Sequence, residues 1–162
     1  MGHRALVARE LPTGRYDCYY AHWGGADLSL ARRLDEADGP SSTVDPSVDP
    51  SVDDDPLATD VHWEQVLREH LDLLTHEALF VVRTDGVDAY RPLWFGPIGG
   101  GVAVSVDPHR PCDDDRLLAW FQGTRDAIVD LIASGDLDRE TGEDCLRRRI
   151  QAWADDRVVL FP

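Results

Sequence analysis

The chain contains no lysine and no asparagine, and all sixteen of its cationic residues are arginine. Against them stand 31 acidic residues, which give a formal net charge of −15 over 162 residues. In dilute buffer this charge would destabilise a compact domain by self-repulsion, whereas molar salt shortens the Debye length to about 3 Å and screens it. The absence of lysine also removes long apolar stems from the surface. The composition therefore predicts a halophilic protein of a concentrated-salt cytoplasm.

A GC-rich genome is the alternative explanation for part of this composition. It would account for the missing asparagine and for the presence of only four isoleucines. It would also enrich arginine, so it does not explain why acidic residues outnumber basic ones by 31 to 16. The alternative to the halophile hypothesis is therefore an ordinary acidic protein from a GC-rich genome.

Long apolar runs are also missing. No segment approaches the roughly 18 to 20 apolar residues that span a bilayer, and the N-terminal residues have no apolar signal-like region. We therefore expect a cytoplasmic protein without a membrane partner. Apolar residues make up 43% of the sequence, and the length suits one domain over residues 1–162.

Cysteine is scarce, with Cys18, Cys112 and Cys145 far apart in the sequence. An odd number without repeated spacing is typical of reduced thiols and not of a disulfide framework. We expect each to be a small buried side chain.

Hydrophobic periodicity and turn residues predict an alternation of strands and helices. Strands are expected over residues 3–11, 15–23, 79–83, 87–95, 102–106 and 157–161. Helices are expected over residues 27–36, 60–78 and 113–135, with a last helix that begins at Asp138. The predicted fold is α+β: a mostly antiparallel sheet of about five or six strands packed by about four helices on one face, including a C-terminal helical hairpin.

Residues 39–57 are predicted to be an acidic Pro/Asp-rich loop or disordered insertion. The motif Val-Asp-Pro-Ser occurs at 44–47 and again at 48–51. Regularly spaced prolines oppose both helix and sheet. A calcium loop would need a glycine turn and a terminal glutamate, which this segment lacks.

The histidines do not have the spacing of a metal site. His62 and His70 would lie about 12 Å apart along a helix, and no His-Glu-x-x-His motif is present. Cys18 and His22 would lie about 13 Å apart in an extended strand, so they could join His109 and Cys112 around zinc only through a local bend. We therefore predict no metal and no cofactor, with His22, His109 and Cys112 as the residues that come nearest to a site.

Aromatic residues are concentrated in two predicted strands. They are Tyr16, Tyr19, Tyr20 and Trp23 in one, and Tyr90, Trp94 and Phe95 in the other. One face of the sheet is thus predicted to be aromatic. Exposed rings would form a protein-binding patch or ligand cleft, whereas buried rings would pack under the helices.

Three consecutive arginines, Arg147, Arg148 and Arg149, lie on the last predicted helix. They could hold a phosphate or an acidic partner, or could pair with neighbouring acids. The overall negative charge disfavours nucleic acid as a partner.

Several motifs together resemble a family of small haloarchaeal proteins of unknown function. They are Gly-His-Arg-Ala-Leu-Val-Ala at 2–8, Tyr-Asp-x-x-Tyr-x-His-Trp-Gly at 16–24, Glu-His-Leu-Asp at 69–72 and Tyr-Arg-x-Leu-Trp-Phe-Gly at 90–96. The resemblance covers most of the chain outside the Pro/Asp-rich segment. It implies a haloarchaeal cytoplasm and no particular activity.

The leading functional hypothesis is a non-catalytic binding or regulatory module with a protein partner or a second copy. The candidate binding residues are Tyr20, His22, Trp23, Trp94, Arg147, Arg148 and Arg149. The alternative is a metal-assisted or histidine-dependent hydrolase built around His22, His70 or His109.

Overall fold

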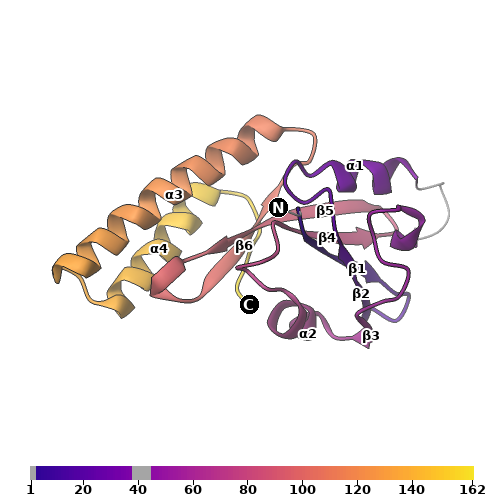
Figure 1. The fold of residues 1–162 in the computed structure, drawn as a ribbon, viewed down its shortest axis with the longest axis horizontal. Helices are drawn as coiled ribbons and strands as arrows, with labels where there is room; N and C mark the ends of the chain where they lie inside the picture. Colours follow the sequence, from indigo (N-terminus) through magenta and orange to yellow (C-terminus); the bar gives the residue numbers. More distant parts are fainter. Residues whose placement is uncertain (1–2, 38–44) are drawn as a thin grey trace.

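The computed structural model describes residues 3–37 and 45–162, which form one seven-stranded sheet in the order β3-β2-β1-β4-β5-β6-β7 (Figure 1). The strands are β1 (Ala5–Glu10), β2 (Tyr16–Ala21), β3 (Ala58–Val61), β4 (Ala78–Arg83), β5 (Gly86–Trp94), β6 (Gly101–Val106) and β7 (Val159–Leu160). All neighbouring strands are antiparallel except β1 and β4, which run parallel with Leu6 beside Leu79. The predicted α+β class with a mostly antiparallel sheet is confirmed, with seven strands where five or six were expected.

The additional strand is β3, which lies where a helix was predicted to begin. Asp60, the first residue of the predicted helix, is in β3 with a left-handed φ of 54°. Its N–H donates to Asp17 Oδ1 at 3.0 Å, and its carbonyl accepts from Arg15 Nε at 2.7 Å. These bonds hold residue 60 against β2. The short helix α2 (Trp63–Gln65) therefore begins later, after His62, and continues as a π-helical turn (Val66–His70).

The helices cover both faces of the sheet, so the prediction that they share one face is wrong. On one side lie α1 (Ser29–Glu36), α3 (Pro111–Ser134) and α4 (Arg139–Ala154). On the other side lies α2 with its π-helical turn (Figure 1). Alternate residues of β1 serve the two cores: Val7 belongs to the first and Leu6 to the second.

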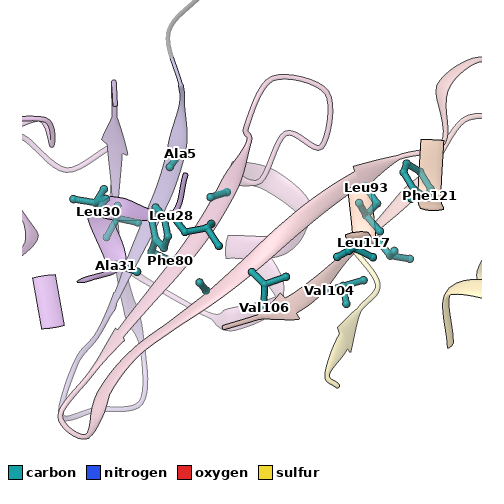
Figure 2. Packing of buried hydrophobic residues seen from close by; sticks show 14 of the residues in the cluster. Ala5, Leu28, Leu30, Ala31, Phe80, Leu93, Val104, Val106, Leu117 and Phe121 are labelled. Carbon is teal, nitrogen blue, oxygen red and sulfur yellow. The ribbon is translucent and has the colours of Figure 1, made fainter. Parts of the chain in front are cut away.

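The first core joins distant parts of the chain. Figure 2 shows Ala31 of α1 near Phe80 of β4, and Leu117 of α3 near Leu93 of β5. This arrangement explains why β4 is apolar along nearly its whole length, because both of its faces are covered.

The C-terminal helical hairpin and the final edge strand are confirmed. Trp120 of α3 stacks on Trp153 of α4, with ring centroids 5.3 Å apart. The two helices are antiparallel neighbours joined at Gly135, and β7 pairs with β6 at the sheet edge (Figure 1). Within the described residues, no helix has both the length and the apolar character that a membrane span requires.

The described part of the Pro/Asp-rich segment, residues 45–57, packs on β2 and α1. It contains a 3-10 turn (Pro46–Val48), and Val52 is buried and bridges to Ala21. Arg33 Nε of α1 donates to the buried Asp49 at 2.7 Å. The remaining residues of this predicted loop, 39–44, lie outside the described part of the chain.

A buried ion pair connects the elements of the first core. The side chains of Arg91 in β5 and Asp114 in α3 are only 4% and 5% exposed. The guanidinium donates to both carboxylate oxygens of Asp114, at 2.9 Å from Nε, and to the backbone carbonyls of Gly25, Ala26 and Glu77. All five of its N–H donors are therefore used.

Removing the charge of Asp114 should destabilise the fold severely, because it leaves the Arg91 charge buried without its partner. We expect Asp114→Asn to lower the free energy of unfolding by about 3 kcal/mol, measured by urea denaturation. Asp126→Asn on the same helix is the matched control, because the Asp126 carboxylate that pairs with Arg125 is 65% exposed. It should cost less than about 1 kcal/mol. Equal losses in the two variants would contradict this role for the buried pair.

Candidate functional site at one edge of the sheet

The strand directions bring several polar and aromatic residues to one edge of the sheet, where the ends of several strands lie side by side. Strands β1, β4 and β6 begin at this edge, and β2 and β5 end there. The segments that flank these ends carry His3, His22, Trp23, His76, Glu77 and Trp94. Backbone bonds tie three of the segments together: Gly25 N–H donates to His3 O at 3.1 Å, and Glu77 N–H donates to Arg4 O at 2.8 Å.

Two histidine–carboxylate pairs lie at this edge. His3 Nδ1 is 3.1 Å from Glu77 Oε2, and its ring lies edge-on to Trp23 at a centroid distance of 6.1 Å. His22 Nε2 is 2.9 Å from Asp53 Oδ1. Both pairs are well exposed.

The ring of Tyr20 lies near two histidines. Its centroid is 4.8 Å from that of His22 and 6.2 Å from that of His76. The structure thus brings the predicted candidates Tyr20, His22 and Trp23 together with His3, His76 and Glu77, which the sequence interpretation missed.

A tight turn between residues 72 and 76 holds Leu74 in solvent. Asp72 Oδ1 accepts from the N–H groups of Leu74 at 2.9 Å and Thr75 at 3.3 Å. Asp72 N–H donates to His76 Nδ1 at 3.0 Å, and His76 N–H donates to Asp72 O at 2.9 Å. These bonds compete with helical ones, so the helix predicted to reach residue 78 ends at His70. Leu74 remains 61% exposed at the tip of the turn.

The same contacts determine the protonation states of the His76 and Asp72 side chains. Burial lowers the pKa of His76 below its ordinary 6.5, and the charge of Asp72 offsets this only in part. Because Nδ1 accepts the Asp72 N–H, the proton of the neutral ring lies on Nε2. Burial opposes ionisation of Asp72, but the hydrogen bonds from Leu74 and Thr75 outweigh it and lower the pKa of Asp72.

Two hollows flank Trp94. One, of about 300 Å³, is lined by His76, Glu77 and Phe121 among others. The other, of about 440 Å³, is lined by residues 67–70 of the π-helical turn, which include the predicted candidate His70, and by the segment that follows the turn. Trp94 and Leu74 line both hollows.

The prediction that one face of the sheet is aromatic is wrong. Tyr19 packs in the first core, whereas Tyr16 and Tyr90 pack in the second. Successive residues of a strand point to opposite faces, so a run of aromatic residues is divided between them. Among the aromatic candidate residues, the two tryptophans remain accessible: Trp23 is 56% exposed and Trp94 is 38% exposed.

The three consecutive arginines have separate environments. Arg147 bonds Glu143 at 2.8 Å and lies over the rings of Phe95 and Phe161. Arg148 is exposed and donates a long hydrogen bond, of 3.4 Å, to the Asp144 carbonyl. Arg149 lines a groove between α3 and α4. They do not form one binding ridge.

The residues nearest to a metal site are not brought together. His109 and Cys112 follow the end of β6, at the opposite edge of the sheet from His22. Cys18 is buried in β2, and burial raises its pKa to about 12, so it is a thiol. Cys112 is exposed, which contradicts the prediction that every cysteine is buried. Among residues 3–37 and 45–162, no three His, Cys, Asp or Glu side chains form a group that could hold a metal ion.

The chain belongs to DUF6735, a family of unknown function, whose model matches residues 1–49 and 45–161. No curated protein and no solved structure matches the chain.

The lowered pKa of His76 predicts a pH dependence of stability above the range in which carboxylates titrate. The unfolded chain takes up a proton more readily than the folded chain. Stability is therefore full above about pH 6.5 and falls as the pH drops towards the lowered pKa, by no more than about 1.4 kcal/mol per pH unit. Urea unfolding between pH 7.5 and 5.5 would measure this loss. His76→Asn, which can still accept the Asp72 N–H but does not titrate, should show a flatter profile, and an unchanged slope would contradict the assignment.

Proposed function

We propose that this member of DUF6735 is a non-catalytic binding module that docks a protein partner through Trp23, Leu74 and Trp94. The observation that supports it is the exposure of these three large apolar side chains at one edge of the sheet. Exposed aromatic and aliphatic residues on a rigid support are typical of the anchors at the centre of protein interfaces.

Hydrogen bonds fix the backbone that carries Leu74 and Trp94, and a fixed backbone favours a binding role for these exposed side chains. Leu74 stands on a turn closed by hydrogen bonds from both ends. Trp94 ends β5 three residues after Arg91, whose guanidinium is fully bonded. A pre-organised surface loses little entropy when a partner binds.

Fewer observations support the alternative function, a histidine-dependent hydrolase. Its starting point would be the His22–Asp53 pair, which resembles the base and orienting carboxylate of a catalytic triad. Both side chains are about half exposed. Catalytic groups of this kind usually lie where water is excluded, so this alternative ranks second.

We also propose that the module works in the cytoplasm of a salt-accumulating, haloarchaeal cell. The net charge of −15 and the absence of lysine support this setting. High concentrations of some salts strengthen the burial of apolar surface, so a partner could be held by Trp23, Leu74 and Trp94 where surface ion pairs are screened.

The docking proposal can be tested by affinity purification from haloarchaeal lysate kept in multimolar potassium chloride. We expect a stoichiometric protein that is retained by the native chain and lost from Trp23→Ser, Leu74→Ser or Trp94→Ser. Each of these three substitutions should weaken binding by about 30-fold in a titration with the purified partner. Leu57→Ser is the control, because Leu57 is comparably exposed but lies beside β2 and β3, outside the proposed surface. Retention that is equal in all variants would exclude this surface.

The salt adaptation makes a separate prediction. The temperature of unfolding should rise between about 0.1 M and about 3 M potassium chloride, because the added salt screens the repulsion among surface carboxylates. Circular dichroism would follow the transition. A constant unfolding temperature over this range would favour the ordinary acidic protein.

A further inference from the structure

Two glycines that lie within helices have opposite surroundings. Gly142 of α4 is buried, and a Cβ at that position would lie 2.6 Å from Ile132 Cδ1 of α3. Close packing of the two helices therefore explains Gly142. Gly123 of α3 is exposed, and a Cβ there would meet nothing within 4 Å. Glycine destabilises a helix interior relative to alanine, and none of the described residues around Gly123 explains why glycine is required there.

Gly123 lies in an apolar groove along α3 and α4. The groove has a volume of about 560 Å³ and is lined by Trp120, Leu131 and Leu137 in addition to three exposed small residues, Ala119, Gly123 and Ala127. Leu131 is 46% exposed. The small residues recur every four positions, so they lie on one face of α3 and allow another helix to approach closely.

Two residues of opposite charge on α3, Arg116 and Asp130, lie symmetrically about Gly123. Arg116 stands seven residues before it and Asp130 seven residues after it, and both are exposed. No acidic residue occurs between 117 and 125, although the chain has 31 acids. On α3, the row of small residues is therefore flanked by one cation and one anion at matching distances from Gly123, and Arg149 of α4 lines the groove beside it.

This symmetry matches a second copy of the same helix. If two α3 helices pack antiparallel about a twofold axis at Gly123, each residue before the axis faces the residue equally far behind it on the partner. Ala119 then faces Ala127, and Arg116 faces Asp130, each twice. Asp115 and Asp126 face the apolar Leu131 and Trp120, so no like charges meet across the axis.

We propose that the chain forms a twofold homodimer in which the α3 helices pack antiparallel with Gly123 on the axis. The near-antiparallel packing class crosses at about 20°. Over seven residues, about 10 Å of helix, such a crossing separates the axes by only about 4 Å, which the long arginine side chain spans. This surface is separate from the proposed docking surface of Trp23, Leu74 and Trp94, so either proposal can fail without the other.

The oligomeric state of the full chain tests the proposal. Light scattering in molar potassium chloride should give twice the chain mass of 18.1 kDa for the native protein and the monomer mass for Gly123→Leu. The added side chain enters open space in the monomer, so circular dichroism should show an intact fold. Ala133→Leu, an exposed position of α3 that does not line the groove, is the matched control and should remain dimeric. A native monomer, or a dimer that Gly123→Leu leaves intact, would overturn the proposal.

A charge swap tests the register of the two helices. Arg116→Asp and Asp130→Arg should each raise the dimer dissociation constant by about tenfold or more, because each places like charges opposite one another. The double variant should restore the native constant. These constants should be measured at the lowest salt concentration at which the chain is folded, since salt screens the effect. A double variant no tighter than the single ones would exclude this register.

Discussion

The fold depends on one buried charge that is fully satisfied. Arg91 is buried in β5, an internal strand of the sheet, where an unpaired guanidinium would cost several kcal/mol. Its bonds to Asp114, to the loop after β2 and to the segment before β4 hold these parts at fixed positions. Those segments carry Trp23 and Glu77, so the same interaction positions much of the candidate surface at this edge of the sheet.

The candidate surface exposes three large apolar side chains on a strongly acidic protein. Trp23, Leu74 and Trp94 leave apolar area in contact with water, which is costly in concentrated salt unless a partner covers it. The turn that carries Leu74 is held by Asp72 and His76. These two side chains serve local structure, which fits a binding surface better than a catalytic centre.

Local sequence signals predicted the elements whose stability is local. The strands expected over residues 3–11 and 15–23 correspond to the hairpin of β1 and β2, those over 79–83 and 87–95 correspond to the hairpin of β4 and β5, and the helix expected over 113–135 corresponds to α3. The turn and cap residues that bound these elements lie within a few residues of them. The predicted helix at 60–78 failed at both ends. At its start Asp60 is held by Arg15 and Asp17 of a distant strand, and at its end Asp72 and His76 form a turn instead.

The sequence by itself determined the acidic composition, the α+β class and the presence of aromatic residues at strand ends, because charge, periodicity and turn residues act over short distances. Only the tertiary structure decided that β1 and β4 are parallel neighbours, which places His3 beside Glu77 and joins Trp23 to the rest of the edge. It also divided the aromatic residues between two cores and directed the three arginines to separate places. These outcomes depend on strand order and helix packing, which arise from contacts between residues far apart in the chain.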